Sequence, residues 1–211
     1  MKTIRPLNPR ELAKLEKDLR QGETILKSQK RFFLGWTLLA VLVGSFVYFR
    51  LDSKAELYLL MGTVITYISI GVWVFLEQFS KTNKRRTSIE FAKAKNEITS
   101  IRVNSRKYIE LSEVEDEGVF YLFQLENNRI LSFGGQDFYP TKKFPSDSFE
   151  IAVLYGVKDE IVLLEKYLSG NKLEPLFKIT GQEKWDLLAK SGYPDPERFT
   201  MIEGILEDYR N

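Results

Sequence analysis

Several side chains that enzymes commonly use for nucleophilic and acid–base chemistry are missing from this chain of 211 residues, which contains no histidine and no cysteine. This composition excludes Ser-His-Asp and Cys-His catalytic groups, a histidine general base, and zinc sites with histidine or thiolate ligands. It also excludes disulfides, which suits a reducing compartment. Neither glycine-rich phosphate motif, GxxxxGK[ST] or GxGxxG, is present. Carboxylates, lysines, tyrosines and serines remain for chemistry, and we expect no cofactor.

The densest group of carboxylates lies at Glu113 to Glu117, EVEDE. Oxygen ligands of this kind suit a hard cation such as Mg²⁺ or Ca²⁺. The spacing differs from that of a calcium-binding loop, so a solvated acidic turn is the favoured interpretation. The alternative is an enzyme that uses carboxylates with a divalent cation, which requires Asp116, Glu117 and Asp137 to converge in one pocket.

A second polar segment, Gly134 to Asp147 (GGQDFYPTKKFPSD), combines glycines, prolines, aromatic residues and charges of both signs. Loops on rigid β scaffolds often carry function, so this segment is the candidate recognition loop. Its candidate contact residues are Gly134, Gly135, Asp137, Tyr139, Lys142, Lys143 and Asp147. The alternative is a long connection that folds its aromatic side chains over one end of a core, because aromatic residues this dense usually fill a core.

Two apolar runs, Phe32 to Phe49 and Leu57 to Leu76, must anchor the rest of the chain. Neither contains Asp, Glu, Lys, Arg or His. At about 1.5 Å per residue they span about 27 and 30 Å, which matches the hydrocarbon thickness of a bilayer. The seven residues between them, RLDSKAE, suffice only for a tight turn. The sequence therefore predicts a transmembrane helical hairpin rather than two buried helices of a soluble domain.

The distribution of charge orients this hairpin. Lysine and arginine flank its two outer ends, whereas Arg50 and Lys54 in the loop are offset by Asp52 and Glu56. Basic residues collect on the cytoplasmic side, so both termini should be cytoplasmic and the short loop 50–56 outside. The basic residues after the second run are candidate lipid-headgroup contacts, with a purely topogenic role as the alternative. These four are Lys81, Lys84, Arg85 and Arg86.

The two parts of the chain carry opposite net charge. Residues 1–96 contain 17 Lys/Arg and 8 Asp/Glu, whereas residues 97–211 contain 14 and 21. An acidic domain is repelled from an anionic membrane surface and should stand in the cytosol. It also lacks the basic face that nucleic-acid binding needs, so we expect no nucleic-acid partner.

Helix signals divide the N-terminal part of the chain. Asn8-Pro9 is typical of a helix start, and Gln21-Gly22 predicts a helix end or an elbow. Small residues four apart, Ala40/Gly44 and Gly62/Thr66, allow close packing between the two apolar helices or between copies of the chain. We therefore expect an N-terminal cytoplasmic amphipathic helix at 1–31, the hairpin at 32–76 and a basic juxtamembrane helix at 77–96.

Short alternating segments predict a β-rich domain at 97–211. The asparagines between Gly118–Leu125 and Arg129–Phe133 indicate a hairpin, and the Gly170-Asn171 turn suggests another, between Ile161–Tyr167 and LEPLFKI. Further strands are expected at 98–103, 107–111, 149–155 and 199–206. A late helix is expected at 182–190, with Trp185, Leu188 and Ala189 on one face. The predicted fold class is an α+β membrane protein in which a two-helix transmembrane hairpin precedes a mostly antiparallel barrel or sandwich.

A series of short sequence motifs lies between Asp116 and Glu150: DEG, YLFQL, GGQDFYP, FP and FE. It resembles a cytosolic β-rich domain of uncharacterised bacterial membrane-anchored proteins. The resemblance implies a bacterial inner membrane but no activity and no functional residues.

The leading functional hypothesis is a membrane-anchored cytosolic domain that binds or regulates a protein partner. The alternatives are the carboxylate enzyme described above and an accessory subunit of a transporter or oligomeric membrane assembly. The expected partners are membrane lipid and either an unknown protein or a second copy of the chain.

Overall fold

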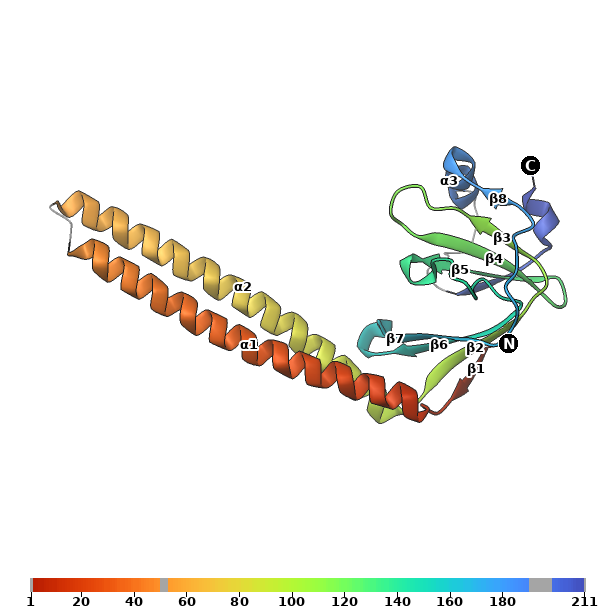
Figure 1. The fold of residues 1–211 in the computed structure, drawn as a ribbon, viewed down its shortest axis with the longest axis horizontal. Coiled ribbons are helices and arrows are strands. Elements are labelled where there is room, and N and C mark those ends of the chain that lie inside the picture. The colour runs from red at the N-terminus through yellow and green to blue at the C-terminus, as the bar shows by residue number, and fades with distance from the viewer. Residues whose placement is uncertain (1, 50–52, 190–198, 211) are drawn as a thin grey trace. The chain divides into compact units, whose positions relative to one another are not determined.

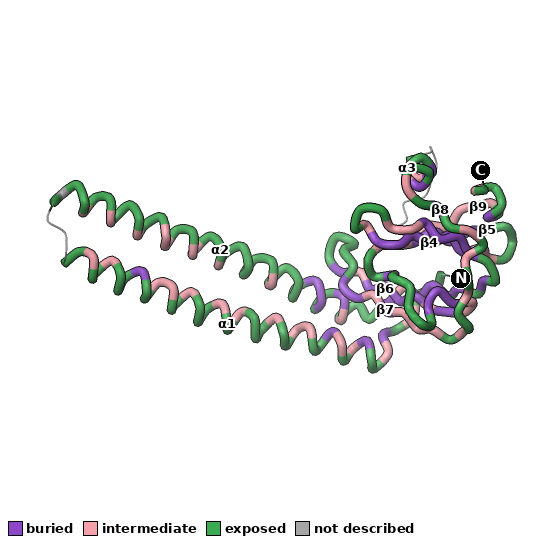
Figure 2. The backbone as a smooth tube through the Cα atoms, turned by 45° about the horizontal axis from the view of Figure 1, so that its top comes forward, coloured by how far each residue is buried: buried purple, intermediate pink, exposed green. Residues whose placement is uncertain are grey.

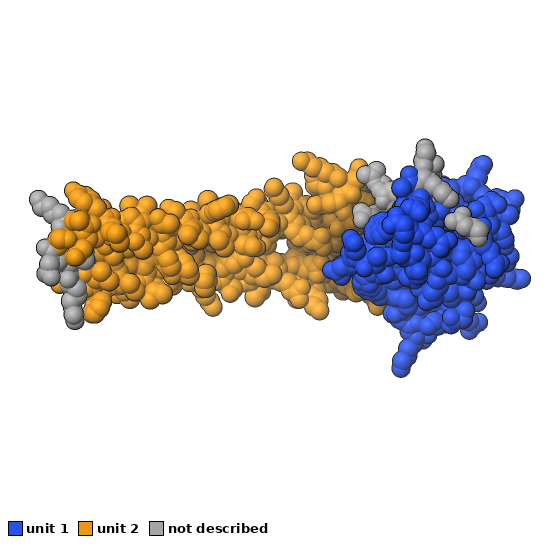
Figure 3. Space-filling model, turned by 90° about the horizontal axis from the view of Figure 1, so that it is seen from above, with its two compact units in different colours: residues 1–4, 99–152, 164–211 blue, residues 5–98, 153–163 orange. Residues whose placement is uncertain are grey.

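The computed structural model describes residues 2–49, 53–189 and 199–210. Two long helices are followed by a β-rich region with one late helix, so the predicted α+β fold class is confirmed (Figure 1). The chain forms two compact units (Figure 3). Unit 1 comprises residues 1–4, 99–152 and 164–211, and unit 2 comprises residues 5–98 and 153–163.

Helix α1 (Pro9–Tyr48) begins at a well-defined cap. The Asn8 side chain accepts a hydrogen bond from the Glu11 N–H at 2.9 Å, and the Glu11 carboxylate accepts from the Asn8 N–H at 2.8 Å. This capping box satisfies two N–H groups that no helical carbonyl can reach. Arg5 pairs with the buried Glu11 carboxylate at 2.7 Å, which neutralises it.

The predicted break at Gln21-Gly22 is wrong, because α1 continues through both residues for 40 residues in all. A glycine inside a helix costs only about 1 kcal/mol, and packing can offset that cost. A Cβ at Gly22 would lie 3.6 Å from the Thr82 methyl group, so the missing side chain lets the second helix approach closely. The segment predicted as a separate N-terminal helix is therefore the first part of α1.

Helix α2 (Lys54–Lys95) is capped by the Ser53 side chain and ends at Asn96, whose φ of 52° terminates the helical backbone. The Asn96 side chain also accepts a hydrogen bond from the Leu7 N–H at 3.2 Å, which ties the start of α1 to the end of α2. The helices lie side by side (Figure 1). Residues 50–52 of the predicted outer loop lie outside the described residues.

The apolar parts of α1 and α2 pack through small and aromatic residues. Ala40 is buried, and a Cβ at Gly44 would lie 3.2 Å from Val64. The small residues Ala40 and Gly44 therefore allow α1 to pack closely on α2, which is one of the two alternatives predicted from the sequence. The Trp36 ring stacks on the Tyr67 ring at 4.0 Å, and its indole N–H donates to the Tyr67 carbonyl at 3.3 Å.

Gly71→Val is expected to open the hairpin beside Trp36. A Cβ at Gly71 would lie 2.7 Å from the indole nitrogen of Trp36, so the ring would have to leave α2. Thermal unfolding in detergent should show a loss of helical signal at a lower temperature. Gly62→Val is the control, because no atom lies within 4 Å of a Cβ there. Equal melting of the two variants would contradict this packing.

Both helices are long and apolar enough to cross a membrane. In the most apolar stretch of α1 only 6% of the residues are buried, and in that of α2 the share is 0%. Figure 2 shows this as long green and pink stretches of the helices, with purple confined to a few turns. The apolar side chains of these windows therefore face outward rather than into a protein core.

The described strands form two sheets, with strand orders β8-β3-β4-β5-β9 and β1-β2-β6-β7. The strands are β1 (Lys2–Arg5), β2 (Ile98–Asn104), β3 (Tyr108–Leu111), β4 (Val119–Leu125), β5 (Arg129–Gly135), β6 (Ser148–Tyr155), β7 (Ile161–Leu168), β8 (Lys178–Ile179) and β9 (Thr200–Glu203). The predicted hairpin is confirmed as β4 and β5, with Asn127 and Asn128 at positive φ in the turn.

Strand β4 is apolar from Val119 to Phe123 because both of its faces are buried there. Tyr121 and Phe123 face an aromatic core, where Phe123 meets Phe149 of β6 at 5.1 Å between ring centroids, so the two sheets pack face to face. Phe120 and Leu122 face the opposite way, into a cluster covered by α3 (Gly181–Ala189) and the 3₁₀ helix η4 (Leu206–Tyr209). Alternation of side chains across the strand separates the two cores.

Three details differ from the sequence-based expectations. Strand β7 is not followed by a hairpin partner at LEPLFKI; instead β8 runs parallel to β3. The predicted face of α3 held Trp185, Leu188 and Ala189, but the buried residues are Lys184 and Leu187, with Leu188 partly buried against the core. Lys190 lies outside the described residues. The last strand is shorter than expected, because β9 ends at Glu203 and η4 follows. All three features depend on packing between segments that are distant in the sequence, and the local periodicity of the sequence does not predict such packing.

Candidate functional site

The acidic segment and the candidate recognition loop meet in unit 1. The Tyr139 hydroxyl donates a hydrogen bond to the Glu113 carboxylate, and the Gln136 amide donates to the Asp116 carbonyl at 2.7 Å. The hydrogen bond to Glu113, with some burial and the Glu113 charge, raises the pKa of Tyr139 to about 12. Tyr139 is therefore a neutral hydrogen-bond donor at physiological pH.

Glu117 is set apart from the other carboxylates by a buried lysine. The Lys184 side chain is fully buried, and its ammonium donates to Glu117 and to the Ser112 carbonyl, the latter at 2.9 Å. The same ammonium lies 4.5 Å from the centroid of the Phe120 ring. The buried cation thus has an anion, a carbonyl and an aromatic face around it, as a buried charge requires.

The environment of Glu117 strongly favours its charged form. Burial by itself would raise its pKa, but hydrogen bonds from Lys184 and from the backbone N–H groups of Val114, Glu115 and Glu117 outweigh this effect. Together they hold the pKa of Glu117 at about 2. Glu117 is therefore ionised, and its negative charge is compensated by Lys184 within unit 1.

The carboxylate hypothesis needs three side chains in one place, and the structure divides them. Glu117 turns inward to Lys184, whereas Asp116 and Asp137 are exposed. Within the described ranges, no group of three or more Asp or Glu side chains could hold a metal ion. The acidic segment is therefore best described as a loop closed by its own hydrogen bonds, including the one from the Gly118 N–H to Glu113 at 3.1 Å.

Most of the candidate recognition residues maintain the fold. Gly134 lies opposite Phe120 in the β4–β5 pairing, and Gly135 has a φ of 110°, which favours glycine. The Asp147 carboxylate accepts a hydrogen bond from the Asn171 N–H at 2.9 Å. The Asp137 carbonyl accepts one from Lys166. Sequence reasoning did not separate these structural roles from recognition.

The aromatic residues of the loop divide between the core and the surface. Phe138 and Phe144 are buried, and Lys166 covers both rings at 5.1 and 5.3 Å from their centroids. Burial lowers the pKa of Lys166. For these two rings the structure bears out the alternative in which the loop folds its aromatics over the core. Tyr139 remains 39% exposed.

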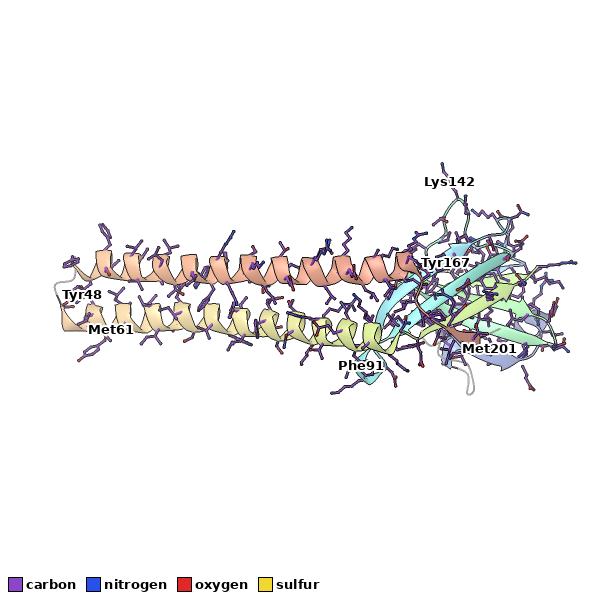
Figure 4. The ribbon with its side chains drawn as sticks, turned by 90° about the horizontal axis from the view of Figure 1, so that it is seen from below. Tyr48, Met61, Phe91, Lys142, Tyr167 and Met201 are labelled. Atoms are coloured by element: carbon purple, nitrogen blue, oxygen red, sulfur yellow. The ribbon has the colours of Figure 1, made fainter. Side chains whose placement is uncertain are left out.

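The tip of the loop is the part that faces solvent. Lys142 and Lys143 are exposed, and Figure 4 shows Lys142 projecting away from unit 1. Among the described residues, neither ammonium group forms an ion pair. Thr141 orders the tip, because its hydroxyl accepts hydrogen bonds from the N–H groups of Lys143 and Phe144 at 3.3 and 3.0 Å. The loop therefore presents two adjacent, uncompensated cations on a structured turn.

A second surface in unit 1 is a polar groove of about 820 Å³ at the end of the sheets that carries the β4–β5 turn. Gln124 organises its wall, donating to the Gly204 carbonyl at 3.2 Å and accepting from the Leu206 N–H at 2.9 Å. Lys107 and Glu207 pair at 3.0 Å beside it. Sequence reasoning missed this groove, because its residues come from four separate segments.

The four basic residues predicted to contact lipid headgroups have different surroundings. Lys81 pairs with Glu77, and Arg86 pairs with Glu90, each one helical turn away. Lys84 is exposed and has no ion-pair partner among the described residues. A cavity of about 370 Å³ between α1 and α2 is lined by Lys81, Arg85 and Arg86 together with acidic and apolar residues.

Arg85 has a structural role within unit 2. Its guanidinium donates to the Val162 carbonyl at 2.7 Å and to the Ile161 carbonyl at 3.4 Å. Ser88, one turn later, accepts from the Val157 N–H at 2.9 Å. Together these contacts fix the tip of the β6–β7 hairpin, including η2 (Val157–Asp159), on α2.

Arg85→Ala is expected to release that tip. The variant removes two charge-assisted hydrogen bonds, so the amides of residues 156–162 should exchange with deuterium about 10- to 100-fold faster. Hydrogen exchange followed by mass spectrometry measures this directly. Lys84→Ala, a neighbouring cation without such contacts, should leave the rate unchanged. Unaltered protection in Arg85→Ala would show that the contacts do not hold the tip.

No protein-family model matches this chain, and neither the curated proteins nor the solved structures contain a significant match to it. The resemblance of residues 116–150 to a bacterial membrane-anchored group stays a prediction from the sequence. The functional argument therefore depends on the chain's own geometry.

Proposed function

We propose that this protein is a bacterial inner-membrane protein that uses a helical hairpin to hold an interaction domain at the cytoplasmic surface. The observation that carries the proposal is that only 6% of the residues in the most apolar window of α1, and 0% of those in the window of α2, are buried. Exposed apolar surface of this extent is not tolerated in water by a monomeric protein, whereas lipid covers it at no cost.

The charge distribution supports the orientation of the anchor. The polar parts of α1 and α2 are joined by Lys93–Glu16 at 2.7 Å and by Arg85–Asp18 at 3.7 Å. Such ion pairs belong in water or at the headgroup layer rather than in hydrocarbon. With the basic residues on this side, both termini are cytoplasmic and the loop 50–56 is outside.

The loop tip at Lys142 and Lys143 is the part of unit 1 that we assign to partner binding. Two adjacent cations on a turn ordered by Thr141 complement an acidic segment on a partner protein. The net negative charge of residues 97–211 makes this local positive site distinctive within its surroundings. Charge complementarity of this kind sets the rate and specificity of association more than its affinity.

Lys142→Glu/Lys143→Glu is expected to lower recovery of a partner about fivefold or more, because two attractive contacts become repulsive. The measurement is photo-crosslinking in native membranes from a photoreactive residue that replaces Pro140, an exposed residue beside the tip, in the full chain. Arg106→Glu/Arg210→Glu is the matched control, since it reverses two exposed charges elsewhere in unit 1 and should leave recovery unchanged. Equal loss in both variants, or no crosslinked protein from the otherwise unaltered chain, would contradict the assignment.

A further inference from the structure

A cavity of about 370 Å³ lies between the polar parts of α1 and α2, within unit 2. Its volume falls in the range of pockets that hold small ligands. Three basic and two acidic side chains supply its charged lining: Lys81, Arg85, Arg86, Asp18 and Glu23. Positive charges therefore outnumber negative ones in this lining, which favours an anionic ligand.

Among the three cations, Arg85 is the one whose partners an anion can replace. Lys81 and Arg86 each pair with a glutamate one helical turn away, at 2.7 and 2.8 Å. The Arg85 guanidinium donates to two neutral carbonyl groups, and the carboxylate it pairs with, on Asp18, lies 3.7 Å away. The Arg85 side chain is 47% exposed and lines the cavity, so an anion there can reach it.

The depth of Arg85 relates the cavity to the membrane surface. On α2, Lys81 and Arg85 lie five and nine residues beyond the second apolar run. At about 1.5 Å per residue, these positions are about 8 and 14 Å beyond the hydrocarbon. Helical side chains lean by about one turn towards the N-terminus of their helix, which for α2 is the membrane side. The basic groups therefore reach towards the lipid head groups, a step that rests on the proposed membrane location.

The acidic groups of the cavity lie further into the cytoplasm. On α1, Glu23 and Asp18 lie nine and 14 residues before the first apolar run. Because α1 enters the membrane in the opposite direction from α2, their side chains lean away from the membrane. The end of the cavity that faces the head groups is therefore basic, and the far end is acidic.

We propose that the basic end of this cavity binds the phosphate of an anionic lipid head group, in competition with the tip of the β6–β7 hairpin. An arginine–phosphate pair uses at least one of the terminal nitrogens that now donate to the Ile161 and Val162 carbonyls, so the lipid and the tip compete for one guanidinium. The phosphate wins when it is available, because hydrogen bonds between two charged groups are stronger than those to a neutral carbonyl.

Phosphatidylglycerol has the required chemistry, because nothing in its head group compensates the phosphate charge. Phosphatidylcholine lacks it, because its own quaternary ammonium offsets the phosphate. The hairpin tip is therefore held on α2 at a neutral membrane surface and released at an anionic one.

The test follows hydrogen exchange of residues 156–162 in the full chain, in nanodiscs of phosphatidylcholine alone or mixed with an equal part of phosphatidylglycerol. Phosphatidylglycerol should speed exchange about 10-fold, towards the rate of Arg85→Ala, because the same two hydrogen bonds are lost. Equal exchange in the two membranes would overturn the proposal. Inorganic phosphate added to phosphatidylcholine nanodiscs should have no effect, and an equal acceleration by it would overturn the assignment to a lipid.

Two variants with the same change in net charge separate the cavity from general attraction to the membrane. Ile25→Glu places a carboxylate in the cavity lining, at a residue that is 49% exposed, and should abolish the acceleration. Lys84→Ala also lowers the net charge by one, but Lys84 lies outside the lining, so the acceleration should persist. The same response in both variants, whether kept or lost, would overturn the site.

Arg85→Ala separates the role of this side chain from that of the membrane. Its residues 156–162 should exchange fast in both kinds of nanodisc, and a remaining response to phosphatidylglycerol would overturn the role of Arg85. Co-purification with nanodiscs tests the membrane location by itself. A chain that does not enter nanodiscs would contradict the proposed function and this inference together, whereas a chain that enters them without any lipid response contradicts this inference alone.

Discussion

Gly134→Val is expected to destabilise unit 1 by about 3 kcal/mol or more, enough to unfold many domains. A Cβ at Gly134 would lie 2.1 Å from a ring carbon of Phe120 and 2.6 Å from its Cα atom. The ring could rotate away, but the backbone of β4 cannot yield without breaking its pairing with β5. Loss of the Phe120 position would also remove the aromatic face beneath Lys184.

Urea denaturation of the full chain in detergent, followed by hydrogen exchange in β4 and β5, measures this effect. Gly181→Ala is the matched control. Its Cβ would meet no atom within 4 Å, and only the φ of 58° is unfavourable. The control should therefore cost about 1 kcal/mol. If both variants unfold at the same urea concentration, the close approach of Gly134 to Phe120 does not limit stability.

Lys184→Met is expected to destabilise unit 1 by about 3 kcal/mol. Methionine preserves much of the packing volume, but Glu117 then loses its cation while it remains largely surrounded by protein. The second variant, Glu117→Gln, removes the complementary charge. The double variant Lys184→Met/Glu117→Gln should be more stable than the sum of the single effects predicts, since neither partner is left charged. Strict additivity in urea denaturation would show that the pair is not coupled.

The pH dependence of stability follows from the same pair. Glu117 has a pKa of about 2 in the folded protein and a usual value of 4.5. Because the folded-state pKa is depressed, its contribution is complete above about pH 5 and is lost as the pH falls towards 2. The contribution should be about 3 kcal/mol, from the two values and about 1.4 kcal/mol per pKa unit. Glu117→Gln should therefore lose less stability than the unaltered chain between pH 5 and 2, and parallel curves would contradict the assignment.

The two long apolar helices and the β4–β5 hairpin were predictable from the sequence because their signals are local. Apolar runs of about 20 residues without charged side chains predict helices long enough to cross a membrane, and the adjacent asparagines at 127 and 128 favour the positive φ that the turn requires. The course of α1 through Gly22 was not predictable in this way. Its continuity depends on packing against Thr82, which lies 60 residues further along the chain.

The candidate site shows the same division between local and distant signals. The composition of Gly134 to Asp147 indicated a loop, and its tip does face solvent at Lys142 and Lys143. The inward turn of Glu117 was missed because its partner, Lys184, comes from a helix 67 residues later. The helix itself contained one signal. Lys184 lies on the same face as Leu187 and Leu188, which pack on the core, and a lysine on such a face needs a buried partner for its charge.

Labelling of introduced cysteines tests the central claim most directly, since the natural chain contains none. Single cysteines replace Ser53 in the outer loop, Gly62 within α2, and Lys142 at the loop tip of unit 1. A membrane-impermeant maleimide should label Ser53→Cys in intact cells and Lys142→Cys only after the inner membrane is opened. Gly62→Cys should stay unlabelled in both states. Labelling of Lys142→Cys in intact cells, or of Gly62→Cys in either state, would contradict a membrane-embedded hairpin that holds unit 1 in the cytoplasm.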